Sequence, residues 1–285
     1  MMKLTRMSLF SLLCAFLVFG VLLGCKTTDV VTQDSLQLQA NKDEEGGEAV
    51  AISLIDKGAA LVEQEKFEEA IAVFDDIVRR FGSVYSARER RWGAMAFTNK
   101  GVTLLRQGKI EEAIAVFDDA DRRFSSDNAP EVRGCGAQAL YYKGNTLAEQ
   151  GKTGEAIAVF DDIQSHYYHI CTPDVQKRLA TAQFYKGVIL EEQGRTGEAI
   201  AVYDSMYSWY GYVSSGESCN ADSPELHEWT ANALLNKGVA LGKQGKTKEA
   251  IDTYDDIERH FGNDNSPDVQ KWVAEARRNK TDLSH

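Results

Sequence analysis

The sequence predicts an all-α protein built from repeated helix pairs. A 20-residue phrase begins at Lys57, Lys100, Lys143, Lys186 and Lys237, so its spacing is 43 residues three times and then 51 residues. A fixed period in this range is typical of stacked-repeat architectures. No stretch alternates apolar and polar residues as a half-buried strand would. Because one unit is too small to bury its apolar face alone, neighbouring units must stack into a continuous core.

The copy at Lys143 shows both helices of a unit. Apolar residues recur there at three- and four-residue intervals, which predicts two amphipathic helices separated by Gly151, a residue that suits a left-handed helix end. Gly144 and its counterparts weaken the first helix, so we expect them where two helix backbones approach closely. The first copy has Glu65 in place of the turn glycine, and we expect a looser turn there.

Each first helix has an extension at its front. Thr172-Pro173, Ser223-Pro224 and Ser266-Pro267 combine a capping hydroxyl with Pro at the first helical position. These helix starts account for a period longer than a minimal helix pair. A tryptophan recurs within the extension, and we expect it to pack on the end of a neighbouring helix. The last segment, from Pro267 to about Lys280, is a polar first helix with no second, as expected of a capping helix.

With these positions in place, the chain resembles a tetratricopeptide repeat (TPR) protein from about residue 50 to residue 281. The first-helix glycine, the turn glycine, the Glu-Ala-Ile of the second helix and its later aromatic residue fall at that family's offsets. The resemblance implies a TPR-like right-handed α-solenoid of five helix pairs plus a C-terminal capping helix, with a groove lined by the first helices. The 43-residue period and the lysine before each glycine depart from the family's usual 34-residue pattern.

The first 25 residues have the layout of a bacterial secretory signal. Lys3 and Arg6 precede an apolar run that is short for a membrane span. The run ends in Leu22-Leu23-Gly24-Cys25, which resembles the lipobox and implies cleavage before Cys25 with lipid attached to its sulfur. An uncleaved anchor helix is the alternative. We therefore predict a lipoprotein signal peptide at 1–24, a lipidated cysteine and flexible tether at 25–49, and the solenoid at 50–285.

Lys26 follows the cysteine, and this resembles the sorting pattern for the outer membrane in enteric-type bacteria. We expect a lipid-anchored protein of the cell envelope, in the outer membrane and facing the periplasm. The formal net charge is −11. Such a charge disfavours nucleic acid as a partner and repels anionic head groups, so contact with the membrane is expected through the lipid anchor only.

No motif in the sequence indicates catalysis. A nucleophile elbow, a phosphate loop, a paired-histidine helix and a zinc-ligand set are all missing, so we expect no enzyme, no metal and no cofactor. The expected function is a scaffold for protein–protein interaction. Three alternatives stay open: an assembly lipoprotein resembling those that help insert outer-membrane barrels, a cell-wall-handling enzyme with a carboxylate pair, and a structural spacer.

The expected partner is another protein or a peptide segment that lies across successive first helices. We predict that the groove is lined by the residues at the family's inward-facing offsets. The repeated lysines would either line an anion-binding groove or pair with the equally regular aspartates Asp75, Asp118, Asp161, Asp204 and Asp255; we favour pairing, because an interior lysine needs a partner. The predicted groove residues are Thr98, Val102, Tyr141, Asn145, Phe184, Val188, Leu235 and Val239.

Two further features are candidate sites. Tyr207, Trp209, Tyr210 and Tyr212 form a possible aromatic interaction patch, although aromatic residues at helical spacing are more often packing residues. An oxidising compartment permits disulfides. Cys135–Cys171 is feasible, and Cys171–Cys219 is the alternative pairing. A metal site of Cys171 with His166 and His169 lacks the usual paired ligand spacing.

Overall fold

The computed structural model describes residues 42–83, 86–215 and 223–284, and these form eleven α-helices and no strand. The predicted signal peptide, Cys25 and most of the predicted tether lie outside this range. The chain divides into two compact units, one ending at Lys152 and the other beginning at Thr153. The division falls between the two helices of the third repeat.

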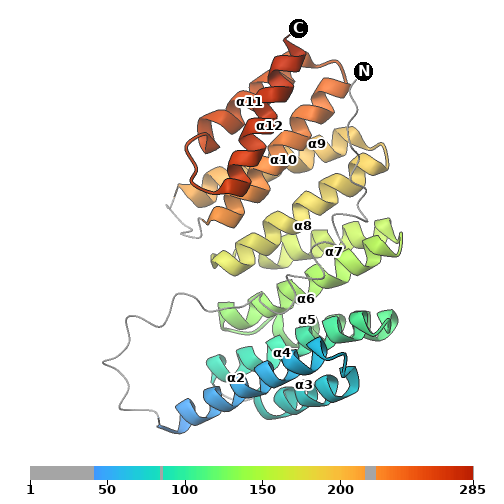
Figure 1. Cartoon of the computed structure of the whole chain (residues 1–285), viewed down its shortest axis with the longest axis vertical. Coiled ribbons are helices and arrows are strands. Elements are labelled where there is room, and N and C mark those ends of the chain that lie inside the picture. Colours follow the sequence, from blue (N-terminus) through green and yellow to red (C-terminus); the bar gives the residue numbers. More distant parts are fainter. Residues whose placement is uncertain (1–41, 84–85, 216–222, 285) are drawn as a thin grey trace. The chain divides into compact units, whose positions relative to one another are not determined.

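The first unit holds two complete helix pairs and one further first helix. Its first helices α2, α4 and α6 contact one another in series, while each second helix packs against the first helix that follows it. Figure 1 shows this alternation from blue to green. The five helices are α2 (Lys42–Glu63), α3 (Phe67–Phe81), α4 (Ala87–Arg106), α5 (Ile110–Phe124) and α6 (Pro130–Glu149).

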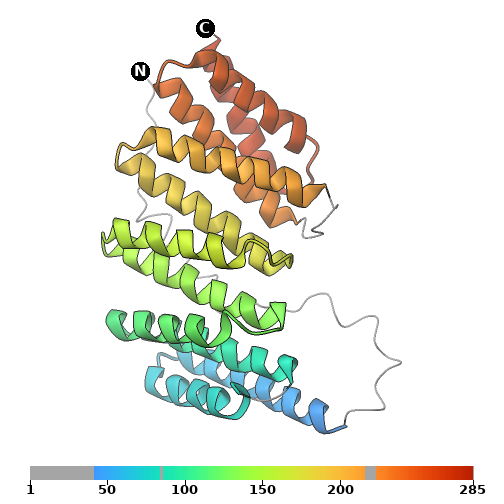
Figure 2. The same ribbon diagram turned by 180° about the vertical axis from the view of Figure 1, so that it is seen from behind.

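The second unit repeats the scheme with α7 as its leading second helix. Its first helices α8, α10 and α12 contact in series, and α7, α9 and α11 each pack against the next first helix (Figure 2). The all-α, TPR-like solenoid with a C-terminal capping helix is thereby confirmed. The helices are α7 (Thr153–Tyr167), α8 (Pro173–Glu192), α9 (Thr196–Ser214), α10 (Pro224–Lys243), α11 (Thr247–Phe261) and α12 (Pro267–Leu283).

The turns inside the helix pairs share one closing geometry. Gly108, Gly151, Gly194 and Gly245 have φ of 80°, 75°, 74° and 76°, as their predicted role requires. The looser turn expected at Glu65 is wrong, because Glu65 adopts the same left-handed conformation with φ of 57°. Its neighbour Lys66 donates its N–H to the Leu61 carbonyl at 2.9 Å, which closes the turn without a glycine.

In α2, α4, α8 and α10, the glycine inside the first helix makes room for an aromatic ring. A Cβ on Gly101 would lie 2.3 Å from Cε1 of Phe117, which belongs to the second helix of the same pair. Gly58 meets Phe74 in the same way. The expected close approach of two backbones is therefore wrong at these positions. Two backbones do approach closely nearer the start of α4, where a Cβ on Gly93 would lie 2.6 Å from Cα of Gly82.

The predicted helix starts are confirmed by their hydrogen bonds. The hydroxyls of Thr172, Ser223 and Ser266 accept from backbone N–H groups three residues ahead, at 3.4, 3.2 and 3.5 Å. Helix α2 begins at Lys42, eight residues before the predicted boundary at residue 50. The ion pair of Glu48 with Arg88, at 3.2 Å, ties its early turns to α4.

Candidate interaction faces

Four predicted groove residues lie on the adjacent helices α4 and α6 of the first unit. Thr98, Val102 and Asn145 are only 2%, 3% and 8% exposed, whereas Tyr141 is half-buried. Thr98 uses its hydroxyl within its own helix, donating to the Ala94 carbonyl at 3.4 Å. The three buried side chains therefore serve as packing, and Tyr141 is the member of this set that reaches the surface.

The other four lie on α8 and α10 of the second unit. Phe184 and Leu235 are buried, at 3% and 5% exposure, and Val188 and Val239 are half-buried. The Phe184 ring is covered by Trp229, with centroids 5.1 Å apart. Trp229 thus packs on the side of a neighbouring first helix and not on a helix end as expected. The buried residues of both units therefore do not offer an exposed groove lining, and for Phe184 the covering side chain is Trp229.

The same first helices carry three buried polar groups, of which Asn145 was predicted from the sequence and Glu149 and Glu191 were not. The Asn145 Oδ1 is buried and has no hydrogen-bond partner among the described residues, and the same holds for Oε1 of Glu149 and of Glu191. Burial raises the pKa of Glu149. It also raises the pKa of Glu191, against the opposing effect of Lys243. Glu191 is the one glutamate at its place among the five copies, so its departure from the repeat pattern was the available signal.

Lysine–aspartate pairs join each helix pair to the next; we call this row the lysine ladder. From Lys100 onward, the lysine at this place of a first helix contacts the aspartate of the preceding second helix, so the predicted pairing is confirmed with an offset of one repeat. The row therefore includes Lys280 of α12, and no described salt bridge involves Lys57. The pairs are Lys100–Asp75 at 2.6 Å, Lys143–Asp118, Lys186–Asp161 and Lys237–Asp204 at 2.5 Å each, and Lys280–Asp255.

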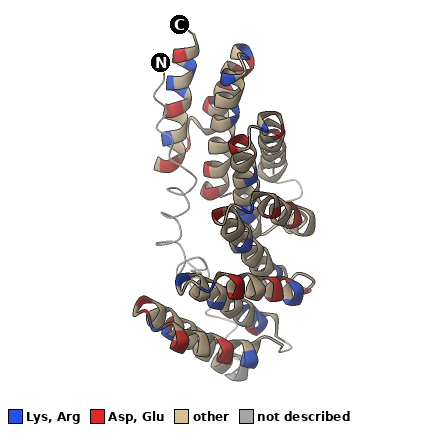
Figure 3. Ribbon diagram, turned by 90° about the vertical axis from the view of Figure 1, so that its right-hand side faces the viewer, with Lys and Arg blue, Asp and Glu red and all other residues tan. Residues whose placement is uncertain are grey.

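A second type of polar contact joins the start of a first helix to the loop that follows the second helix of the same pair, and it occurs in two helix pairs. Arg90 at the start of α4 donates to Asp127, with Nε 2.7 Å from Oδ2, and the guanidinium holds the pKa of that carboxyl below its usual value. His227 occupies the position in α10 that Arg90 occupies in α4, and its Nδ1 lies 2.6 Å from Oδ2 of Asp264. Figure 3 shows acidic and basic residues interspersed along the helices of each unit.

The predicted aromatic patch is divided between core and surface. Tyr210 is 8% exposed and packs edge-on against His227 and tilted against Phe261, at centroid distances of 5.7 and 5.2 Å. Tyr207 packs on His260 at 5.6 Å and is half-buried, as is Trp209. Tyr212 is 52% exposed. Tyr210 is thus a core residue, and a continuous patch of all four is not present.

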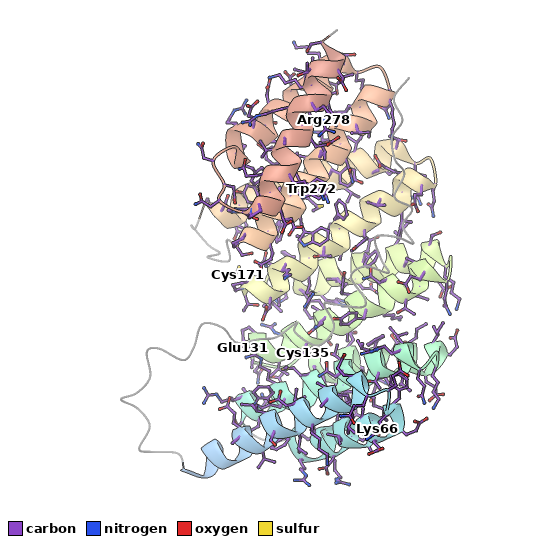
Figure 4. All side chains as sticks on the ribbon, viewed as in Figure 1. Lys66, Glu131, Cys135, Cys171, Trp272 and Arg278 are labelled. Carbon is purple, nitrogen blue, oxygen red and sulfur yellow. The ribbon has the colours of Figure 1, made fainter. Side chains whose placement is uncertain are left out.

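The predicted Cys135–Cys171 disulfide is wrong. Cys135 of α6 keeps its thiol, whose Sγ donates to the Glu131 carbonyl at 3.6 Å. Cys171 lies just before α8 (Figure 4) and is disulfide-bonded, but not to Cys135. Within the described ranges, no group of three His, Cys, Asp or Glu side chains could hold a metal ion. No described helix combines the length and apolarity needed to cross a bilayer.

An all-α chain of helix pairs, each joined to the next through a lysine and an aspartate, defines a helical-repeat protein. Two family models described as tetratricopeptide repeat match it, one at residues 55–128 and 177–209 and the other at 138–167 and 232–263. The matches touch all five predicted repeats and together cover more than half of the chain. The chain belongs to the tetratricopeptide repeat family, and its repeats indicate a scaffold for protein–protein interaction.

Comparison with curated proteins gave no match. Among solved structures, the crystal structure of YrrB, titled a TPR protein with an unusual peptide-binding site, is similar at 17% identity and a TM-score of 0.42, over 84% of this chain and 95% of that one. Two structures of nearly identical TPR-like repeats from Podosopora anserina are similar at 11% identity, with TM-scores of 0.49 and 0.48, over 81% of this chain and 98% of each of those.

Proposed function

We propose that this protein is a lipid-anchored scaffold of the bacterial cell envelope that binds another protein or a peptide segment through its first helices. Membership of the tetratricopeptide repeat family is the main support for the binding role. The sequence Leu22-Leu23-Gly24-Cys25 after an apolar run supports the anchor. Lys26 supports placement in the outer membrane, facing the periplasm.

The anchor is tested by metabolic labelling with an alkyne-bearing fatty acid in a bacterial host. The wild-type chain should take up the label and sediment with membranes, because acyl chains gain about 0.8 kcal/mol per buried methylene. Cys25→Ser should lose both properties, while Cys135→Ser, which removes a buried thiol of the folded part, should keep them. Equal labelling of both variants would refute lipidation at Cys25.

The binding face is supported by the surface-reaching members of the predicted groove. Tyr141, Val188 and Val239 are half-buried, so part of each side chain is open to a partner. In the first unit, the Asn145 Oδ1 near Tyr141 lacks a partner, and an unsatisfied buried oxygen costs about 1–3 kcal/mol. A backbone N–H of a docked segment would relieve this cost once the side chain turns toward it. Charge argues against nucleic acid as that partner.

Site-specific photocrosslinking in native membranes tests the binding face. A benzophenone side chain placed at Val188 or at Val239, on contacting first helices of the second unit, should capture one partner, and Tyr141 tests the first unit in the same way. Asp252 of α11 and Glu155 of α7 are exposed second-helix positions and serve as controls that should capture little. Equal capture from the controls, or different partners from Val188 and Val239, would exclude the first helices as the binding face.

A further inference from the structure

One stripe of every later first helix is covered by the second helix that precedes it. On α6 the stripe is Gly136, Ala139, Lys143 and Thr146; Ala139 is 0% and Thr146 4% exposed, and Ala139 joins the apolar cluster of α5. Ala96 of α4 joins the cluster of α3 in the same way. The corresponding buried residues elsewhere are Leu179, Ala182 and Ile189 on α8, Thr230, Ala233 and Ala240 on α10, and Val273 and Ala276 on α12.

The same stripe of α2 is open to solvent. Val50 is 43% exposed, and Ser53, Lys57 and Ala60 are exposed as well. In the described residues, no second helix precedes α2 and no salt bridge reaches Lys57. The five later lysines at this register each hold an aspartate and are only 18–35% exposed. We name Val50, Ser53, Lys57 and Ala60 the α2 stripe.

We propose that the α2 stripe docks an acidic amphipathic helix of another protein, distinct from the partner of the first-helix face. The five internal contacts define the chemistry of that helix: an aspartate directed at Lys57, with apolar or small side chains against Val50 and Ala60. Such a contact runs over ten residues of α2, or about 15 Å. A carboxylate on the docked helix would pair with Lys57, as an aspartate already pairs with the lysine at this place in each later copy.

A second copy of this chain does not supply that helix. Its five ladder aspartates are each engaged by its own lysines, and α12 covers the last of its second helices. A copy could offer such an aspartate only by opening its own repeat. The occupant is therefore a helix whose aspartate is not already paired.

A peptide of residues 110–124, the sequence of α5, is the probe. Because isolated helices of this length are marginal in water, it is stapled on its solvent side. Saturable binding to the full chain is expected by fluorescence anisotropy. Lys57→Glu in the protein, or Asp118→Lys in the peptide, should each weaken binding about tenfold, since charge-assisted hydrogen bonds are the strong ones. Lys57→Asp combined with the Asp118→Lys peptide should restore it.

Lys66→Glu is the matched control, because Lys66 is exposed in the turn directly after α2 (Figure 4). This variant should bind the peptide as the wild type does. Val50→Asp should weaken binding through the apolar part of the stripe. Absence of binding, or binding that Lys57→Glu leaves unchanged, overturns the proposal. A dimer in sedimentation that Lys57→Glu dissociates also overturns it, because a second copy would then cover the stripe.

Discussion

Glu65 occupies a backbone conformation that four glycines occupy in the later turns. A left-handed conformation costs an L-residue with a side chain about 1–2 kcal/mol. Glu65→Gly should therefore raise the free energy of unfolding by about 1 kcal/mol, after the added freedom of the unfolded chain is subtracted. Urea denaturation measures the change. Gly108→Ala, the reverse change at a φ of 80°, should destabilise the protein, and a destabilised Glu65→Gly would contradict the strain argument.

Asp127 links stability to pH through its pair with Arg90. The pKa of Asp127 is lower in the folded state than in the unfolded chain, so the unfolded chain binds the proton more readily. The pair therefore adds to the free energy of unfolding above the unfolded-state pKa, and this contribution is lost as the pH falls through the folded-state pKa. Asp127→Asn should cost about 2 kcal/mol at pH 7 and progressively less as the pH falls below the unfolded pKa. Denaturant titration over a series of pH values checks this. Asp119→Asn, at a more exposed pair, should show a small effect at every pH.

At the scale of a helix pair, the first-helix glycines can be tested directly. Gly101→Ala places a Cβ 2.3 Å from the Phe117 ring, and such overpacking costs about 1–3 kcal/mol. Adding Phe117→Leu should recover part of the loss, because the flexible side chain can yield. Gly154→Ala in α7 meets nothing within 4 Å and should stabilise the protein, since alanine favours helix. Thermal unfolding compares all three variants; a neutral Gly101→Ala would show that the ring moves freely.

Helix pairs, turn glycines and capping hydroxyls followed from the sequence, because they depend on local backbone chemistry. Ser223 caps α10 as predicted, for example. Glu65 shows the limit, because helix packing on both sides imposes a turn that its own residue disfavours. Gly101 shows another: the periodicity marks a small residue but does not identify the Phe117 ring that fills the space.

The binding face was harder to predict than the fold. Offsets within the repeat place Phe184 and Tyr141 on first helices. The exposure of each side chain, however, depends on which side chains of the neighbouring helices cover it. Phe184 is covered by Trp229, a residue from the next first helix, whereas Tyr141 stays half-buried. Glu191 was missed because a method based on what the copies share overlooks what differs, and no other copy has a glutamate at that place. Family offsets alone therefore do not identify the docking residues of this chain.

For the whole molecule, the end of the repeat array should govern the stability of the second unit. Helix α12 buries Val269, Val273 and Ala276 against its neighbours, and its Lys280 pairs with Asp255. Deleting residues 267–285 uncovers the faces of α10 and α11 that α12 contacts, so both helices should lose protection in amide hydrogen exchange and the protein should aggregate more readily. Removing only residues 284–285 is the control. Unchanged protection in α11 would show that α12 is dispensable.

The lysine ladder bears on how such a gene can grow. Four of its pairs join an aspartate to a lysine 25 residues later, across the border between consecutive repeats. Tandem duplication of one 43-residue block therefore introduces one carboxylate and one ammonium group that meet at the new border. Recombination can lengthen or shorten the array by whole blocks without stranding a charge in its interior. However many repeats the array has, its first lysine, Lys57, has no aspartate of a preceding repeat to pair with.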